Sequence, residues 1–215
     1  AVLSSFSNAG QRCASSSRII VMESIYSRFV SSFVEATKKL RIGPSDQDDL
    51  GPVINQKSHA RILDSIQRAI KEGSKLLTGG NKFIHQEYPN GFYIEPTILE
   101  NASPDAFISR TEIFGPVTCL YKVRDLNEAI ELANASPYGL TSCVHTQSYE
   151  RAHYFARMVQ AGVCMINAGT FGSEPHMPFG GVKDSGNGTR EPGPESIELY
   201  TNLKVVYNNF KLHQN

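Results

Sequence analysis

The sequence predicts an α/β fold in which a mostly parallel sheet is flanked by helices. Two observations support this fold class. Short apolar runs alternate with longer amphipathic segments, and the connections between them are short. The 215 residues, 40% of them hydrophobic, are enough for one large core. A further strand is predicted at residues 204–207, outside this alternation, where it would pair at a sheet edge or with another subunit.

In the first half of the chain, the apolar run at residues 18–22 predicts a buried strand. We expect Ser24 to cap the helix that follows, because a serine side chain accepts a hydrogen bond from a free N–H group at a helix start. Gly43 is expected to end that helix. An apolar stripe predicts a second helix at residues 57–72, and a short strand follows at residues 76–78.

The second half shows the alternation more clearly. A strand is predicted at residues 117–123, and Asp125 is expected to cap the next helix. A strand at residues 141–145, a helix from about Tyr149 and a strand at residues 163–167 complete the series. Strands joined by short helical connections are expected to form a parallel sheet with the helices packed on it.

Composition excludes several classes of function. Lysine plus arginine and aspartate plus glutamate number 21 each, so no excess charge favours binding to nucleic acid or to an acidic membrane. No window approaches the roughly 20 apolar residues of a membrane helix. The four cysteines are far apart and lack metal-ligand spacing, so we expect no metal site. Free thiols favour a reducing compartment, and a cytoplasmic location is predicted.

Cys13 is the strongest candidate for chemistry. It follows a Gly-Gln-Arg turn and precedes small polar residues, which leave room for a substrate. The charges of Arg12 and Arg18 would favour the thiolate, so Cys13 is a candidate nucleophile. The alternative is a small buried apolar residue, which describes most free cysteines.

Three further segments carry weaker signals. Glu112 and Phe114 lie just before a strand, where they can contact a ligand or serve as a helix-terminal acid and a core ring. Residues 178–188 are rich in glycine but lack the spacing of a phosphate-binding loop, which favours a structural loop. Glu174 and His176 are an acid–base pair or incidental residues of a surface loop.

Taken in order, the motifs resemble those of one family, the NAD(P)-dependent aldehyde dehydrogenases, and they extend over nearly the whole chain. An ordered series of this length is far more specific than any single motif. The matching motifs are Gly10-Gln11-Arg12-Cys13, Gly51-Pro52-Val53, Tyr93-Ile94-Glu95-Pro96-Thr97, Glu112-Ile113-Phe114-Gly115-Pro116-Val117, Tyr138-Gly139-Leu140 and Pro178-Phe179-Gly180-Gly181.

The resemblance implies that Cys13 is the nucleophile, whose thiolate attacks the aldehyde carbon. Backbone N–H groups and an asparagine hold the oxyanion, hydride passes to NAD or NADP, and a glutamate activates the water that hydrolyses the thioester. Glu112 would accept hydrogen bonds from the nicotinamide ribose, and Phe114 would limit where the nicotinamide lies. Phe179, Arg12 and Ala14 would line the substrate tunnel.

The resemblance also implies that the chain is the catalytic half of a longer enzyme. We expect residues 1–200 to form the catalytic domain and residues 201–215 to supply an oligomerisation strand and tail. The cofactor-binding domain, with the oxyanion asparagine and the general base, would lie outside the chain. The expected partners are therefore a small aldehyde, that missing N-terminal domain and, at full length, further copies in a dimer or tetramer. The isolated chain is expected to be inactive.

The substrate implied by the resemblance is an aldehyde that carries a carboxylate. Asn167 is expected to support the substrate loop, whose Glu174 and His176 resemble a branch of semialdehyde dehydrogenases. Arg12 would pair with the substrate carboxylate or act as a structural residue of its turn.

Three other classes of function remain open at this point. A cysteine hydrolase or acyltransferase would also use Cys13, but it needs a histidine base placed by a third group. A dehydrogenase that passes the thioester to coenzyme A shares the same cysteine. A non-catalytic scaffold would keep the fold and leave Cys13 unreactive.

Overall fold

A four-stranded sheet in the order β1-β6-β5-β2 forms the centre of the molecule, in a computed structural model that describes residues 1–172 and 174–210. The strands β1 (Arg18–Met22) and β5 (Thr97–Glu100) run parallel to the central strand β6 (Val117–Val123). At the far edge, β2 (Lys75–Thr78) is antiparallel to β5. The prediction of a mostly parallel sheet flanked by helices is confirmed.

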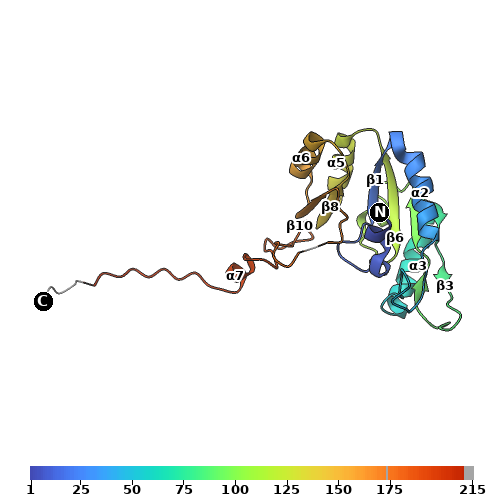
Figure 1. Cartoon of the computed structure of the whole chain (residues 1–215), viewed down its shortest axis with the longest axis horizontal. Helices are drawn as coiled ribbons and strands as arrows, with labels where there is room; N and C mark the ends of the chain where they lie inside the picture. The colour runs from blue at the N-terminus through green and yellow to red at the C-terminus, as the bar shows by residue number, and fades with distance from the viewer. Residues whose placement is uncertain (173, 211–215) are drawn as a thin grey trace.

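Helices cover both faces of this sheet, as Figure 1 shows. Alternate side chains of β6 point to opposite faces, because successive residues of a strand alternate. Cys119 and Tyr121 belong to a core formed with α3 (Gln56–Lys71). Leu120 belongs to a second core, formed with α1 (Val2–Phe6) and α2 (Tyr26–Lys38). The result is a three-layer arrangement with apolar side chains on both sides of the sheet.

Two pairs of strands lie beside the main sheet. The parallel strands β8 (Thr141–Val144) and β9 (Val163–Ile166) form a sheet of their own. The strands β7 (Tyr138–Gly139) and β10 (Val182–Lys183) form a short antiparallel pair. The elements that complete the described chain are a hairpin, four helices and two 3₁₀ turns: β3 (Lys82–Phe83), β4 (Tyr93–Ile94), α4 (Phe107–Arg110), α5 (Leu126–Asn134), α6 (Tyr149–Met158), α7 (Ser196–Leu199), η1 (Ser7–Gly10) and η2 (Glu23–Ile25).

Local signals predicted the second half well. The strand β6 has the predicted bounds, and α6 begins at Tyr149. The Asp125 side chain caps α5, because its Oδ1 accepts a hydrogen bond from the Glu128 N–H at 3.0 Å. The prediction that one parallel sheet would contain all three strands of this half is wrong, because β8 and β9 do not pair with β6.

Two predicted boundaries of α2 are also wrong. Ser24 does not cap this helix, because it lies within the 3₁₀ turn η2 that follows β1 directly. The residue at the cap position is Ile25, whose side chain makes no capping hydrogen bond. The helix ends at Lys38, before Gly43 is reached.

The C-terminal segment leaves the body of the molecule after α7 and extends away from it (Figure 1). Within residues 201–210 no strand is assigned, and Leu203, Val206 and Tyr207 are exposed. The strand predicted at residues 204–207 thus has no partner in the described chain, and its pairing with another subunit stays a prediction. Residues 211–215 of the predicted tail lie outside the described residues.

None of the helices in the described ranges is both long enough and apolar enough to cross a bilayer.

Candidate active site

Cys13 lines a cavity of about 800 Å³. Arg12 and Cys13 reach this cavity from the loop between η1 and β1, and Glu112 and Phe114 reach it from the loop before β6. These residues are about 100 positions apart in the chain, as their numbers show. The structure therefore brings together the candidate nucleophile and the two candidate cofactor contacts.

An unusual backbone turn presents Cys13. Asn8, Ala9 and Gly10 have φ angles of 54°, 52° and 66°, so consecutive residues adopt the left-handed conformation. This conformation is costly for alanine and persists only where the surroundings impose it. The Gln11 N–H donates to the Asn8 carbonyl at 3.0 Å, and Asn8 Nδ2 donates to the Gln11 carbonyl at 3.2 Å. These bonds close the turn immediately before Arg12 and Cys13.

Gly10 packs the cysteine loop directly against the other loop of the site. A Cβ atom at Gly10 would lie 2.1 Å from the Gly115 carbonyl oxygen, which is far inside van der Waals contact. Within that second loop, Ile113 is buried and its carbonyl accepts a hydrogen bond from Arg61 Nη2 at 2.7 Å. Its neighbours Glu112 and Phe114 face outward as a result, and Phe114 is 42% exposed.

Gln11 is a positioning residue that the sequence did not single out. Its Oε1 accepts a hydrogen bond from the Ile54 N–H at 2.8 Å, and its Nε2 donates to the Pro52 carbonyl at 3.3 Å. The side-chain amide thus pairs with a distant loop as a backbone strand would. No local signal in the sequence indicates this role, because the contact joins segments far apart in the chain.

Thr170 holds the other side of the cysteine loop and was also missed. Its Oγ1 donates to the Ala14 carbonyl at 2.6 Å and lies 3.0 Å from Ser16 Oγ. Ala14 itself is only 8% exposed, and it is absent from the lining of the Cys13 cavity. The structure therefore places Ala14 in the support of the loop, and its predicted contact with substrate stays a prediction.

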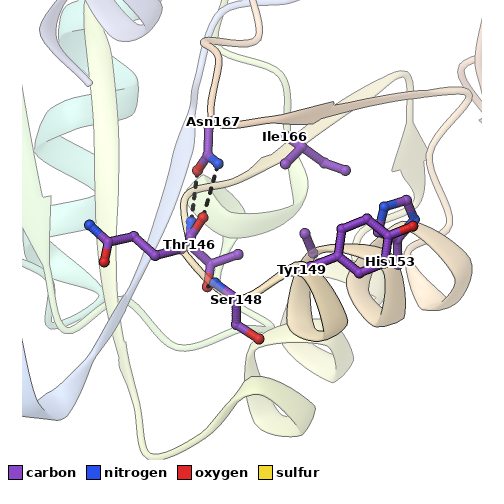
Figure 2. A pocket seen from close by; sticks show the side chains of 8 residues that line it. Thr146, Ser148, Tyr149, His153, Ile166 and Asn167 are labelled. Atoms are coloured by element: carbon purple, nitrogen blue, oxygen red, sulfur yellow. Dashed lines mark hydrogen bonds between the residues drawn. The ribbon is translucent and has the colours of Figure 1, made fainter.

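Asn167 lies at a second, smaller cavity of about 360 Å³, and not at the Cys13 cavity. Its side-chain amide accepts from the Thr146 N–H at 2.8 Å and donates to the Thr146 carbonyl at 2.9 Å, as Figure 2 shows. It therefore continues the pairing of β8 and β9 by one step. The support of the substrate loop by Asn167 stays a prediction.

Phe179 is partly buried and also lies outside the lining of the Cys13 cavity. Its backbone forms two hydrogen bonds of 3.0 Å with Glu191, one in each direction. The sequence-predicted site is thus divided: Arg12, Cys13, Glu112 and Phe114 share one cavity, and Phe179 does not join them in this chain.

The four cysteines differ sharply in their surroundings. Cys13 is exposed, which removes the alternative that it is a buried apolar residue. Burial raises the pKa of Cys119 to about 12, and burial also raises the pKa values of Cys143 and Cys164. These three thiols are therefore poor nucleophiles at neutral pH. Arg18, which was expected to favour the Cys13 thiolate, is instead bonded to α5: its guanidinium donates to the Leu132 carbonyl at 2.7 Å.

Cys119 makes the stability of the fold depend on pH. Its pKa rises from 9.0 to about 12 on folding, so between these values the unfolded chain binds fewer protons than the native one. Stability is therefore expected to fall as pH rises above 9, by about 2 kcal/mol at pH 10.5. Urea unfolding at pH 8 and 10.5, under reducing conditions, measures this loss. The Cys119→Ala variant should lose less, and an equal loss in both proteins would contradict the assignment.

A histidine base for Cys13 is not formed in the parts of the chain that the structure describes. Glu174 and His176 are exposed and lie outside the lining of the Cys13 cavity. His145 lines the cavity, but no hydrogen bond joins a histidine to Cys13 Sγ within residues 1–172 and 174–210. The geometry therefore gives no support to a cysteine hydrolase. The same residues contain no cluster of three or more metal-binding side chains.

Comparison with known proteins gives a consistent result. A family model described as the aldehyde dehydrogenase family matches residues 1–206. Alpha-ketoglutaric semialdehyde dehydrogenase of Bacillus subtilis (strain 168) is 36% identical over 208 residues, which are 96% of this chain and 43% of that protein. The chain spans about two fifths of the length of the relatives it matches.

Two solved structures show the same fold. Betaine aldehyde dehydrogenase from Staphylococcus aureus, a point mutant in complex with NAD+ and with a BME-modified cysteine, has a TM-score of 0.89 at 31% identity. The match covers 93% of this chain and 40% of that one. Aldehyde dehydrogenase 21 from Physcomitrella patens, in complex with the reaction product succinate, has a TM-score of 0.82 at 35% identity, with coverages of 88% and 38%.

Proposed function

Because the chain belongs to the aldehyde dehydrogenase family, we propose that it is the catalytic part of an enzyme that oxidises an aldehyde to a carboxylic acid with NAD or NADP. The observation that carries this proposal is the exposed Cys13, which shares one cavity with Glu112 and Phe114. The modified cysteine of the Staphylococcus aureus relative lends support, because it shows a chemically accessible thiol in a protein of this fold.

The exposed side chains before β6 fit the nicotinamide half of a dinucleotide. The Glu112 carboxylate faces the cavity and can accept hydrogen bonds from ribose hydroxyls, and Phe114 offers an exposed ring. NAD or NADP supplies the acceptor for hydride.

Cys13 would act by forming a bond to the aldehyde carbon. Attack by its thiolate converts the carbonyl to an oxyanion on that carbon, and the Cys13 N–H would donate a hydrogen bond to it. The negative charge assists departure of hydride, which leaves a thioester on Cys13. Hydrolysis of this thioester releases the acid and restores the thiol. The general base for that last step is expected from a part of the protein outside this chain.

Full-length protein incubated with aldehydes, NAD and NADP should show steady formation of NAD(P)H, measured by absorbance. The isolated 215-residue chain should show none, since it would lack the base and most of the cofactor site. Turnover by the isolated chain would contradict the proposal that the general base and most of the cofactor site lie outside it. Addition of coenzyme A to the full-length protein tests whether the thioester goes to water or to a thiol.

We propose further that the substrate carries a carboxylate. Arg12 lies next to Cys13 at the cavity, and within residues 1–172 and 174–210 its guanidinium makes no hydrogen bond or ion pair. A planar guanidinium pairs well with a carboxylate. The names of the Bacillus subtilis semialdehyde dehydrogenase and of the succinate-bound structure agree with such a substrate.

Substitution of Arg12 tests this proposal. In the full-length protein, Arg12→Gln is expected to raise KM for 4-oxobutanoate by about 10–100-fold, since it removes hydrogen bonds to a charged group. KM for the uncharged propanal should change little. Arg157→Gln, at an exposed arginine away from the cavity, is the matched control. Equal increases in KM for both aldehydes would show that Arg12 stabilises its turn and does not bind the carboxylate.

We also propose that residues 1–200 form the catalytic unit and that residues 201–215 serve oligomerisation. The exposed apolar side chains of Leu203, Val205, Val206 and Tyr207 support this role, because such a segment gains stability by pairing with another surface.

A further inference from the structure

A four-residue turn carries the candidate nucleophile. The Arg12 carbonyl accepts a hydrogen bond from the Ser15 N–H at 2.9 Å. Cys13 and Ala14 therefore occupy the two central positions of the turn. The Ala14 carbonyl is not part of the closing bond, and its partner is Thr170, whose Oγ1 donates to it at 2.6 Å. A side chain 156 positions away in the chain thus holds the turn that carries the thiol.

The number of protons fixes the direction of the hydrogen bonds around Thr170. A hydroxyl group has one proton, and that of Thr170 is donated to the Ala14 carbonyl. Thr170 Oγ1 also lies 3.0 Å from Ser16 Oγ, so the proton of this second bond comes from Ser16. The result is a series in which Ser16 donates to Thr170 and Thr170 donates to the Ala14 carbonyl. Hydrogen bonds in series strengthen one another, because each polarises the next.

Ser16 is itself held by the helix that precedes the cysteine loop. Its N–H donates to the Ser4 carbonyl at 2.8 Å, and its carbonyl accepts a hydrogen bond from Ser5 Oγ at 3.2 Å. Ser4 and Ser5 belong to α1 and are buried. The series of hydroxyl groups therefore ends on a buried element and not on an exposed side chain.

Thr170 is poorly placed to bind a substrate itself. It lines the Cys13 cavity, but it is only 6% exposed. Its proton is directed to Ala14, and its oxygen receives the proton of Ser16. Its hydroxyl therefore acts on the turn and not on a molecule in the cavity.

The position of Thr170 in the chain gives this hydrogen bond a further meaning. Thr170 lies in the segment after β9, three residues beyond Asn167, whose amide is fixed by two hydrogen bonds to Thr146. Residues 167–179 are the substrate loop that the family resemblance implies. One hydroxyl group thus joins this loop to the turn of the nucleophile.

We infer that Thr170 is a positioning residue: its hydroxyl couples the substrate loop to the turn of Cys13 and holds the thiol where it can attack the aldehyde carbon. The inference rests on the role proposed for Cys13. Misplacement of a reacting group by about 1 Å can lower a rate by about 100-fold. Loss of this single hydrogen bond is therefore expected to affect the reaction more than the fold.

Two substitutions separate the hydroxyl of Thr170 from its shape. Thr170→Val keeps the shape and loses the hydroxyl, whereas Thr170→Ser keeps the hydroxyl and loses a methyl group. In the full-length protein, Thr170→Val is expected to lower kcat by about 10–100-fold and to change KM by less than about three-fold. The loss should be the same for 4-oxobutanoate and propanal, because it concerns the thiol and not the substrate carboxylate. Thr170→Ser should keep kcat within about three-fold.

Thr37→Val is the matched control. Thr37 is a buried threonine of α2, and its Oγ1 has no hydrogen-bond partner within residues 1–172 and 174–210. Its replacement should leave kcat within about two-fold. Equal losses of kcat in Thr170→Val and Thr170→Ser would overturn the inference. An unchanged kcat in Thr170→Val, or a loss confined to 4-oxobutanoate, would also overturn it.

Amide hydrogen exchange in the same full-length proteins tests the geometry without the reaction. The Ser15 N–H closes the turn, so its exchange rate, resolved by fragmentation mass spectrometry, reports how often the turn opens. Thr170→Val should accelerate this exchange about 10-fold, and Thr170→Ser by less than about three-fold. The Cys119 N–H, which is bonded to the Ser17 carbonyl at 2.9 Å, should be unchanged.

The two measurements distinguish failure of the inference from failure of the proposed function. Unchanged exchange of the Ser15 N–H in Thr170→Val would overturn the inference, whatever the activity. If the protein without substitutions oxidises no aldehyde, the proposed function fails, and the exchange rates still decide whether Thr170 couples the two loops.

Discussion

Substitution of Cys13 by serine in the full-length protein is expected to lower kcat for aldehyde oxidation by at least about 10³-fold. An alcohol at this position is almost fully protonated at neutral pH, so attack on the aldehyde carbon loses its nucleophile. Cys164→Ser, at a partly buried thiol outside the cavity, should leave kcat within about two-fold and is the matched control. The measurement is NAD(P)H formation at saturating aldehyde, with circular dichroism to confirm that both variants fold.

The isolated chain permits a related test that needs no cofactor. At pH 8 a thiol with a pKa of about 12, such as Cys119, is ionised in only about one molecule in 10⁴. Alkylation with iodoacetamide, followed by peptide mass spectrometry, should therefore modify Cys13 at least about 100-fold faster than Cys119. Equal rates at these two cysteines would mean that Cys13 is shielded, and would count against its role as nucleophile.

Gly10→Ala is expected to destabilise the fold by about 3–5 kcal/mol. The new Cβ atom would lie 2.1 Å from the Gly115 carbonyl oxygen, and the backbone at this position has a φ of +66°. Relief of the clash requires the cysteine loop and the loop before β6 to move apart. Loss of Cys13 from its place beside Glu112 and Phe114 should follow.

Two other glycines separate the causes of this effect. Gly73 has a φ of +102° and no atom within 4 Å of an added Cβ, so Gly73→Ala should cost about 1 kcal/mol from backbone strain alone. Gly51 has neither feature, and Gly51→Ala should change stability by less than about 0.5 kcal/mol. Urea unfolding of the three variants should rank them in this order. A Gly10→Ala variant as stable as Gly73→Ala would show that the contact with Gly115 relaxes easily.

Much of the local structure could be predicted from the sequence, because its causes are local. The bounds of β6 follow from a run of mostly apolar residues, and the start of α5 follows from the capping carboxylate of Asp125. The neighbours of β8 could not be predicted in this way. Apolar periodicity reports burial and not the identity of the adjacent strand, so three strands in series were expected to share one sheet.

The residues of the site also differ in whether local sequence or long-range contacts determine their place. Cys13, Glu112 and Phe114 belong to motifs with their own signatures, and the structure brings them to one cavity. Gln11 and Thr170 act through hydrogen bonds to segments far away in the chain, and no local pattern marks such bonds. The amide of Asn167 completes a strand pair, which no local pattern indicates, and its support of the substrate loop stays a prediction.

The contact between Gly10 and the Gly115 carbonyl has a consequence for how the site can change during evolution. It joins main chain to main chain, so it depends on the absence of side chains at these positions and not on the identity of their neighbours. On the roles proposed for Cys13 and Arg12, this contact would hold the cysteine loop in place when Arg12 is replaced. Substrate preference would then be free to change while the geometry of the reaction is retained.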